Sequence, residues 1–485
     1  MTPGSDSRRT KIVATIGPAS DSPEQIAKLI DAGVNVFRLG TAHDDIEFVL
    51  ARVATIRKVA DEKNSTAAVL VDLAGPKVRS GTFGEDGILL VTESSVRLEP
   101  GNDPSSATTI YVNHQRLVDD LQPDDVLNLG DGRAVLRVDS IASDHVVATV
   151  VHGGTMRGRP GVHIHSDRLN IPTPTPEDLV ALDAAIEAGV EMIAVSFVRT
   201  ARDIRALGLE RAPAGPLIVA KIETEAAVAN LDTILSVSDA VMVARGDLGL
   251  ECSLAQLPGL QKHIIEAAVR RGKSVITATQ MLESMTDNAL PTRAEVSDVA
   301  NAVYDGTSAV MLSGETAIGH DPVLVVETMD EILRSAEAGF DNVGWSKQIE
   351  DFGDSETSDD NVRIANAVSA ASIRVIRSLA PESIVCVTGT GASARAICRY
   401  RPDITVLAVT HDEHTYRQLN LVWGATPVLA PPLSEGPGRI RGILDELQSR
   451  GWLKAGQIVP VVAGSSNASL SANVLRVETC QPRPD

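Results

Sequence analysis

Short runs of apolar residues recur along the chain, and each run ends in polar side chains. Eight of them have the composition of buried strands: KIVATIG (11–17), VNVFRLG (34–40), AAVLVDL (67–73), EMIAVSF (191–197), LIVAKIE (217–223), AVMVARGD (240–247), SVITATQ (274–280) and SAVMLSGE (308–315). Seven of the intervals that follow these runs are short enough for one helix. Near-continuous apolar strands separated by helices are typical of a parallel sheet covered by helices. Eight such units predict a closed (β/α)8 (TIM) barrel, and an open doubly wound sheet is the alternative.

The polar residues gather at the carboxyl ends of these runs, which is where barrel enzymes carry their active sites. Lys221 and Glu223 lie two positions apart, so they point to the same face of their strand. The other strand ends carry Arg38, Asp72, Ser196, Arg245, Asp247, Thr279, Ser313 and Glu315. The pattern therefore predicts an active site at this end of the barrel.

One interval is too long for a single helix. Residues 74–175 are rich in Val, Thr, Gly and Asp and contain short alternating runs such as SSVRLEP and RAVLRVDSI. Alternation interrupted by frequent turn residues is typical of a small all-β domain. Because it is inserted at the catalytic end of the barrel, we expect it to act as a lid. We place this domain at 79–171, and the barrel at 1–78 and 172–340.

A second change of composition follows the barrel. The stretch WSKQIEDFGDSETSDD (345–360) is acidic and rich in serine, as linkers are. Beyond it, helical and strand patterns alternate again, as in SIVCVTG, ITVLAVT and IVPVVAG. Residues 345–485 are therefore predicted to form a C-terminal α/β domain of a regulatory type.

The composition narrows the range of partners and locations. A formal net charge of -20 argues against nucleic acid and against an anionic membrane as partners. The first residues lack the apolar core of a signal peptide, and no apolar run is long enough to span a membrane, so a cytoplasmic location is expected. The four cysteines have no metal-ligand spacing, which favours free thiols in a reducing compartment.

The acidic residues at the carboxyl end of the predicted barrel, which we call the barrel mouth, suggest a metal site. Glu223 and Asp247 follow adjacent strands, and two carboxylates completed by water and substrate oxygens suit octahedral Mg²⁺. Lys221 would then neutralise an anionic intermediate beside the metal. The alternative is that the two carboxylates merely pair with Lys221 and Arg245.

Other side chains favour an anionic substrate. The amides of Gly246 and Asp247 open a predicted helix and would offer N–H donors to a carboxylate, unless they form an ordinary turn. Arg38 and Arg79 are suited to phosphate oxygens. Thr279 supplies a hydroxyl, unless it only bonds its own backbone. The spacing thus supports a metal-assisted reaction on a small, phosphorylated anion without selecting the reaction.

Longer motifs in the chain indicate which reaction this is. RRTKIVATIGPAS (8–20), MVARGDLGLE (242–251), SVITATQMLESM (274–285) and PTRAEVSDVANAVYDGTSAVMLSGETA (291–317) resemble the pyruvate kinase family. The third domain is similar to that family in GASARAICRYRPDITVLAVT and RQLNLVWGATPVL. The resemblance covers nearly the whole chain. It implies phosphoryl transfer from phosphoenolpyruvate to ADP, giving pyruvate and ATP in the last step of glycolysis.

The same resemblance implies a role for individual residues. Glu223 and Asp247 would bind the divalent cation, Mg²⁺ or Mn²⁺. Lys221 would stabilise the phosphoryl group in transfer and the enolate. The remaining roles are substrate binding by Arg38, Gly246, Asp247 and Thr279, and nucleotide binding by His43 and Arg79. Arg157 or Arg159 of the lid would add a cation that faces phosphate.

The chain departs from the family beside the phosphate site. Gly40 and Ala42 replace an Asn and a Ser that help to bind K⁺ in potassium-dependent members, together with an Asp that matches Asp72. Leu73 and Lys77 stand where those members have Thr and Glu. Lys77 would supply a tethered ammonium in place of the ion. We therefore expect activity without added K⁺.

These departures leave other functions open. Gly40, and Thr224, Ala226 and Ala227 after the metal-binding Glu, are consistent with a divergent paralogue that is slow or uses another phosphoryl acceptor. A metal-dependent lyase acting on a pyruvate enolate is a second alternative. A non-catalytic protein that senses sugar phosphates is a third, because TGTGAS (388–393) resembles a loop that binds a phosphorylated effector in some members. A homotetramer is usual in the family.

Overall fold

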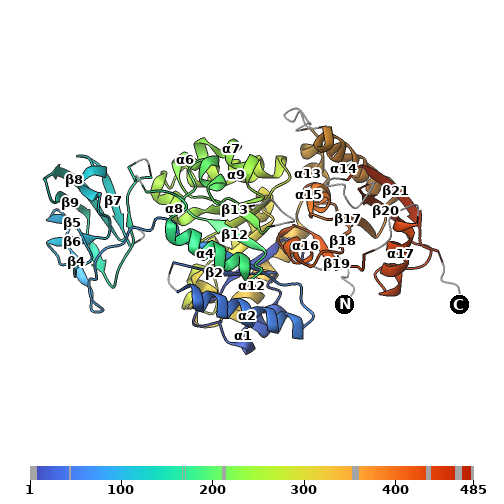
Figure 1. Cartoon of the computed structure of the whole chain (residues 1–485), viewed down its shortest axis with the longest axis horizontal. Helices are drawn as coiled ribbons and strands as arrows, with labels where there is room; N and C mark the ends of the chain where they lie inside the picture. Colours follow the sequence, from blue (N-terminus) through green and yellow to red (C-terminus); the bar gives the residue numbers. More distant parts are fainter. Residues whose placement is uncertain are drawn as a thin grey trace.

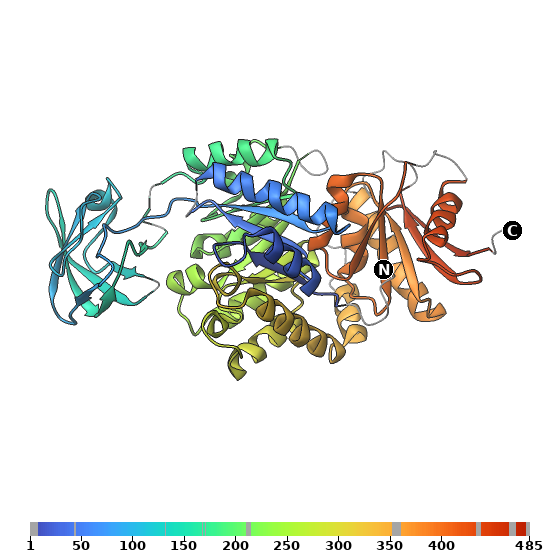
Figure 2. The ribbon, with the colours of Figure 1, turned by 90° about the horizontal axis from the view of Figure 1, so that it is seen from below.

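The computed structural model describes residues 8–42, 45–130, 132–166, 168–169, 171–209, 215–351, 360–432, 438–464 and 472–481. Three parts follow one another along the molecule: an all-β part at one end, a barrel in the middle and an α/β part at the other end (Figure 1). Figure 2 shows the same order and the all-β part standing clear of the barrel. The predicted fold class is confirmed.

Eight parallel strands close into the central barrel, in the order β1-β16-β15-β14-β13-β12-β3-β2. Each strand lies within one of the apolar runs of the sequence. Their bounds are β1 Lys11–Thr15, β2 Val36–Gly40, β3 Ala68–Leu73, β12 Met192–Val195, β13 Leu217–Ile222, β14 Ala240–Ala244, β15 Ser274–Ala278 and β16 Ala309–Leu312.

The barrel strands are apolar along most of their length because both of their faces are buried. Val13 belongs to an inner cluster to which all eight strands contribute. Its neighbours Ile12 and Ala14 belong to the outer cluster, together with Ile26 and Leu29 of the first helix. Strands that are buried on both faces cannot show the polar alternation of a half-exposed sheet, which explains the continuous runs in the sequence.

Helices surround the barrel, and several of them begin at a residue whose side chain caps the helix. Ser22 caps α1 and accepts from the amide of Gln25, while Gly33 ends that helix with φ 108°. Thr292 and Glu295 form a capping box at α10. The bounds are α1 Pro23–Ala32, α2 Ile46–Glu62, α4 Pro176–Glu187, α5 Ala201–Arg205, α6 Glu225–Ala229, α7 Leu231–Val237, α8 Arg245–Glu251, α9 Leu257–Arg270, η1 Glu283–Thr286, α10 Arg293–Asp305, α11 Gly314–Ala317 and α12 Pro322–Ala338.

The prediction of a single helix in each interval is wrong for the later strands. The intervals after β13, β14, β15 and β16 each hold a short helical segment before the next helix: α6, α8, η1 and α11. After β14 the chain turns into such a segment directly at the strand end, because α8 begins at Arg245. The polar residues of the barrel mouth therefore lie partly on short helices.

The inserted part is all-β apart from one turn of helix, α3 Leu117–Asp120. A six-stranded sheet runs in the order β11-β7-β8-β9-β5-β6, and β10 pairs with β4. Alternate residues of its strands, such as Val96 and Leu98, fill a separate core. The bounds are β4 Ile88–Leu90, β5 Ser95–Pro100, β6 Thr109–Val112, β7 Val126–Leu129, β8 Ala134–Ile141, β9 Val146–His152, β10 Gly154–Met156 and β11 Val162–His163.

The C-terminal part is a five-stranded sheet with helices, in the order β19-β18-β17-β20-β21. Only its last pair, β20 and β21, is antiparallel. The bounds are α13 Asn342–Asp351, α14 Asp360–Leu379, β17 Ser383–Val387, α15 Ala392–Cys398, β18 Thr405–Thr410, α16 Glu413–Gln418, η2 Leu419–Leu421, β19 Ala425–Leu429, α17 Arg439–Ser449, β20 Ile458–Ala463 and β21 Val474–Thr479.

The predicted linker at 345–360 is wrong in its first half. Residues 345–351 belong to α13, in which Ser346 and Ile349 are buried, and residues 352–359 lie outside the described chain. The segment forms a helix despite its acidic composition because Trp345 attaches it to the C-terminal part. Its indole N–H donates to Arg399 O at 2.8 Å, so the segment is held against the C-terminal part.

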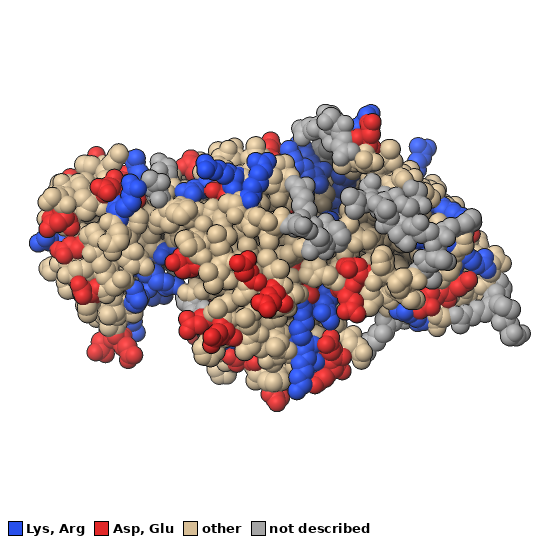
Figure 3. Space-filling view, viewed as in Figure 1, with Lys and Arg blue, Asp and Glu red and all other residues tan. Residues whose placement is uncertain are grey.

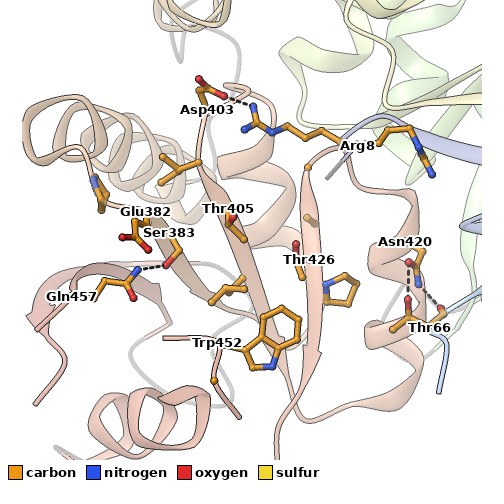
Figure 4. Close-up of a pocket in the computed structure, with 18 of the residues that line it drawn as sticks. Arg8, Thr66, Glu382, Ser383, Asp403, Thr405, Asn420, Thr426, Trp452 and Gln457 are labelled. Carbon is orange, nitrogen blue, oxygen red and sulfur yellow. Dashed lines mark hydrogen bonds and ion pairs between the residues drawn. The ribbon is translucent and has the colours of Figure 1, made fainter. Parts of the chain in front are cut away.

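A cavity of about 1050 Å³ lies between the barrel and the C-terminal part (Figure 4). Thr66 of the barrel donates a hydrogen bond to Asn420 at its edge, at 3.0 Å. Lys11 of β1 reaches across the same boundary and donates to Ala425 O at 2.9 Å. These bonds join the end of the barrel opposite the predicted active site to the C-terminal sheet.

The surface charge is mixed. On the face shown in Figure 3, basic and acidic side chains are interspersed rather than gathered by sign over whole domains. Among the described helices, none is both long enough and apolar enough to cross a membrane. The four cysteines are free, as the sequence predicts.

Candidate active site

Lys221 and Glu223 meet other charged groups at the carboxyl end of the barrel. The ammonium Nζ of Lys221 lies 3.5 Å from Asp72 Oδ1 at the end of β3 and 3.3 Å from Glu223 Oε2. Its shortest polar contact in the described structure is a hydrogen bond of 2.7 Å to Ser196 Oγ, just after β12. Three adjacent strands therefore bring an ammonium, two carboxylates and a hydroxyl together.

Arg38 joins this group from β2. Its Nε donates to Asp72 Oδ2 at 2.8 Å, a second guanidinium nitrogen lies 2.7 Å from the same oxygen, and Nη1 donates to Thr15 Oγ at 3.1 Å. Burial alone would raise the pKa of Asp72, but Lys221 and Arg38 more than offset it, and the pKa is lowered. Asp72 is therefore a fixed negative charge that orients two cations toward the mouth.

Glu223 has the environment of a metal ligand. It is fully buried, and its Oε1 accepts the backbone N–H of Phe197 at 2.6 Å. Its Oε2 has no hydrogen-bond partner within the described structure. Burial, and to a smaller extent the charge of Asp247, raise the pKa of Glu223 to about 7 against the opposing effect of Lys221. A divalent cation would coordinate this oxygen, which has the Lys221 ammonium at 3.3 Å but accepts no hydrogen bond there, and would relieve the repulsion between the two carboxylates, so the residues present fit such an ion.

The alternative prediction is that the two carboxylates pair with Lys221 and Arg245, and only one of these two pairs is observed. Glu223 does lie near Lys221, but Arg245 does not pair with Asp247. Arg245 is buried and bonds to Asp298 at 2.6 Å and to Ala278 O at 3.1 Å. Asp247 is therefore left half-buried at the mouth, without an ion pair to Arg245.

The amide of Gly246 is engaged rather than open. It donates to Thr279 Oγ at 2.9 Å, and the same hydroxyl donates to Ala278 O at 2.7 Å. Thr279 has a positive φ of 68°, a conformation that non-glycine residues rarely adopt outside strained sites. A substrate carboxylate would have to replace Thr279 as the acceptor of the Gly246 amide.

A second cavity, of about 430 Å³, lies between the barrel and the inserted β part. Asp247 and Phe197 line its barrel side. Its cationic lining consists of Lys77, Arg79, Arg133, Arg157 and Arg159. In a chain with a net charge of -20, five cations around one cleft favour an anionic ligand.

Lys77 interacts electrostatically with the charged residues of the barrel mouth. Loss of hydration and the charge of Lys221 lower its pKa, while Asp247 and Asp72 act in the opposite direction. Arg79 lies two residues further along the chain, and its guanidinium donates to Arg159 O at 3.4 Å. His43, the other predicted nucleotide-binding residue, lies outside the described residues.

Gly40 ends β2 beside the guanidinium of Arg38. A Cβ atom added at Gly40 would lie 3.8 Å from Arg38 Nη2, which is an ordinary contact distance. The backbone therefore leaves room for a larger residue. Arg38 has no side chain from position 40 against it and depends on Asp72 and Thr15 for its orientation.

Some polar residues at strand ends serve the fold instead of the mouth. Glu315 is fully buried and accepts the amides of Leu282 and Ser313.

A contact between α8 and the inserted β part was not predicted from the sequence. Glu251 on α8 accepts both the amide and the hydroxyl of Ser166, at 2.8 and 2.5 Å. The sequence carries no local signal for this contact, because the two residues are 85 positions apart.

A closed (β/α)8 barrel with this charged mouth, facing a cationic cleft under an inserted β domain, defines a barrel enzyme for small anionic substrates. Comparison with known proteins identifies the family of barrel enzymes to which the chain belongs. The family model for the pyruvate kinase barrel domain matches residues 7–326, and that for the pyruvate kinase alpha/beta domain matches residues 366–478.

Curated relatives agree with these matches. The chain is 39% identical over 430 residues to a pyruvate kinase of Methylorubrum extorquens, with 88% of each chain covered. It is 38% identical over 464 residues to one of Sporosarcina psychrophila, covering 94% of this chain and 78% of the relative. It is 37% identical over 462 residues to one of Geobacillus stearothermophilus, with the same coverage. The chain belongs to the pyruvate kinase family.

Proposed function

We propose that this chain catalyses the reaction of its family at the barrel mouth. It is a phosphotransferase that moves a phosphoryl group from phosphoenolpyruvate to ADP and yields pyruvate and ATP. The observation that carries the assignment of the site is the convergence of Lys221, Glu223 and the Asp72–Arg38 pair, with the ammonium within 3.5 Å of both carboxylates.

The proposed roles follow from charge. Phosphoryl transfer needs positioning and neutralisation of negative charge more than covalent help from the protein. Arg38 and Lys221 would bind the phosphoryl group, and Lys221 would also stabilise the enolate left after transfer. Gly246 and Thr279 would hold the substrate carboxylate, with Thr279 near the carbon that then takes a proton.

The family generally needs Mg²⁺. Glu223 and Asp247 would hold the divalent cation, Mg²⁺ or Mn²⁺, which when bound neutralises charge on the substrate oxygens. Oε2 of Glu223 is buried and accepts no hydrogen bond within the described structure, which supports this proposal. Asp247 would also contact the substrate through its backbone amide.

The nucleotide would enter the cleft under the inserted β domain. Arg79 would contact its phosphates from the barrel side, and Arg157 or Arg159 from the lid, with His43 as a further predicted contact. Closure of the lid over this cleft would exclude water and limit hydrolysis. A lyase acting on the same enolate would have no use for such a cationic cleft, so the kinase reaction is favoured.

We further propose that K⁺ is not required, although the family usually needs it. Gly40 and Ala42 offer no side-chain oxygen, and Lys77 interacts electrostatically with Asp72. The Lys77 ammonium would take the place of the monovalent cation. Gly40 is also the departure that would slow the enzyme, because it leaves one side of Arg38 without a side-chain contact.

Three wider proposals rest on the family alone. A phosphorylated effector would bind at the TGTGAS loop (388–393), where Gly391 adopts a φ of 75° before α15. The protein would form a homotetramer. It would act in the cytoplasm. We keep 1–78 with 172–340, 79–171 and 345–485 as the proposed limits of the three domains.

The test is pyruvate release from phosphoenolpyruvate with ADP and Mg²⁺, with and without K⁺. We expect comparable rates with K⁺ and Na⁺, and a loss of at least about 100-fold in Lys221→Met, because the main charge neutralising the phosphoryl group is removed. Strong activation by K⁺ over Na⁺ would refute the proposal about the monovalent ion. Unchanged turnover in Lys221→Met would refute the site.

A further inference from the structure

Two consecutive residues, Ser196 and Phe197, contact the two charged groups at the end of β13. Ser196 Oγ accepts a hydrogen bond from Lys221 Nζ at 2.7 Å. The amide of Phe197 donates to Glu223 Oε1 at 2.6 Å. The turn that follows β12 thus holds the ammonium with a side chain and the carboxylate with the backbone.

The hydroxyl of Ser196 is the nearest partner of the ammonium. An ammonium and a carboxylate in direct contact lie about 2.7–2.9 Å apart. The carboxylate oxygens around Lys221 are farther away, at 3.5 Å for Asp72 and 3.3 Å for Glu223. Ser196 Oγ occupies the close position and in turn donates a hydrogen bond to Asp72 Oδ1, at 3.3 Å. The ammonium is therefore held between two carboxylates without pairing tightly with either.

The turn is held in one conformation. Phe197 has a positive φ of 54°, which a non-glycine residue keeps only when its surroundings enforce it. Gly75, after β3, packs directly against it. A Cβ atom at Gly75 would lie 3.0 Å from Ser196 Cβ and 2.8 Å from a ring carbon of Phe197, so only glycine fits there. Ser196 is itself 2% exposed. Its hydroxyl cannot turn away to water.

We propose that Ser196 is a positioning residue for the reaction. By taking the shortest hydrogen bond of Lys221, it keeps the ammonium from collapsing onto Asp72 or Glu223 and leaves its charge directed at the substrate. This inference rests on the proposed function, since Lys221 must act on a phosphoryl group for its position to affect the rate.

A purely structural role predicts a different outcome. If Ser196 only fills a buried polar position, its loss would lower stability and leave the turnover of the folded protein unchanged. If it positions Lys221, the fold would tolerate the loss, because Asp72 and Glu223 still surround the ammonium. The turnover would fall instead.

The experiment compares Ser196→Ala with Ser308→Ala in the full chain. Ser308 lies just before β16, at the end of the barrel away from the mouth. It is also buried, and its Oγ accepts the amide of Val275 at 3.1 Å. The measurements are kcat and KM for phosphoenolpyruvate, Mn²⁺ affinity by titration, and the thermal unfolding midpoint. Ser196→Cys, which keeps the shape with a weaker hydrogen-bond acceptor, is measured alongside.

We expect kcat to fall about 10- to 100-fold in Ser196→Ala, as misplaced catalytic groups do, with KM changing less than about threefold. Mn²⁺ affinity should change less than about threefold, because the Phe197 amide still holds Glu223. Ser196→Cys should lose at least about fivefold in kcat, and Ser308→Ala should keep the kcat of the parent chain.

Three results would overturn the inference: an unchanged kcat in Ser196→Ala, a loss confined to KM, or a loss of kcat that Ser308→Ala shares. If Ser196→Ala does not fold, Ser196→Cys carries the test, and a parental kcat in that variant overturns it. An inactive parent chain would instead refute the proposed function, so the two failures are distinguishable.

Discussion

Glu251 of α8 accepts both the backbone amide and the hydroxyl of Ser166, at 2.8 and 2.5 Å, across the junction between the barrel and the inserted β domain. His163 Nε2 lies 3.2 Å from the same carboxylate. One side chain of the barrel thus holds the segment by which the chain returns from the lid.

Replacing Glu251 with Gln should loosen this junction. The amide keeps the size of the carboxylate but loses the charge that strengthens both hydrogen bonds from Ser166. We expect faster hydrogen exchange at 162–166 and a rise of about three- to tenfold in KM for ADP, with less change in KM for phosphoenolpyruvate. Unchanged exchange at these residues would show that Glu251 does not hold the lid.

The same carboxylate predicts a pH dependence. Burial would raise the pKa of Glu251, but hydrogen bonds from His163 and Ser166 outweigh it and lower the pKa below the ordinary value of 4.5. A lowered pKa means that the stabilisation is present above about pH 4.5 and is lost as the pH falls through the folded-state value. The difference in unfolding midpoint between the parent and Glu251→Gln should therefore be constant near neutrality and shrink below pH 4.5. A difference that grows on acidification would contradict this.

Arg401 fastens the C-terminal part to the barrel. It is 2% exposed and donates to Val303 O at 2.9 Å and to Thr307 O at 2.5 Å, at the end of α10. Its guanidinium also lies 4.6 Å from the ring centre of Phe340 and 4.8 Å from that of Trp423.

We expect Arg401→Met to lower the free energy of unfolding by about 2–4 kcal/mol, because Thr307 O loses the hydrogen bond from Arg401, Val303 O keeps only the one from the Gly306 amide, and the guanidinium leaves the aromatic rings. Chemical denaturation measures this. Arg441→Met is the control: Arg441 is exposed and pairs with Asp445 on one helix, so its loss should cost less than about 0.5 kcal/mol. Equal effects in the two variants would contradict the role of Arg401.

Lys77 should replace the monovalent cation. Lys77→Met is expected to lower kcat/KM for phosphoenolpyruvate by about 10- to 100-fold, since one positive charge leaves the site. Added K⁺ should not restore the rate, because Gly40 and Ala42 supply no side-chain ligands. The control is Lys63→Met on the surface of α2, where the lysine pairs with Asp31. Full recovery of Lys77→Met in K⁺ would contradict this account.

The sequence predicts most of the fold because the barrel strands are buried on both faces. Each of the eight apolar runs contains one observed strand, and the long interval holds the strands β4 to β11, as its alternating pattern predicts. The later strands β19 and β21 were missed. Only two of the five residues of β19 are buried, Ala425 and Val428, and β21 mixes apolar with polar residues at the edge of its sheet, so neither forms a buried apolar run.

The candidate site was predictable only in part. Lys221, Glu223 and Asp72 follow from their positions at strand ends, because parallel strands bring those ends together. The engaged amide of Gly246 and the role of the Ser196–Phe197 turn do not follow. They depend on a rare backbone conformation and on hydrogen bonds between distant parts of the chain, which leave no periodic pattern in the sequence.

In the proposed mechanism, Glu223 and Asp247 hold a divalent cation beside Lys221, and this arrangement transfers a phosphoryl group. The most direct measurement is the joint yield of pyruvate and ATP from phosphoenolpyruvate, ADP and Mg²⁺ by the parent chain and by Glu223→Gln. We predict equal amounts of both products from the parent chain, and a loss of at least about 100-fold in the variant. Pyruvate without ATP, or parental yields from Glu223→Gln, would contradict the account.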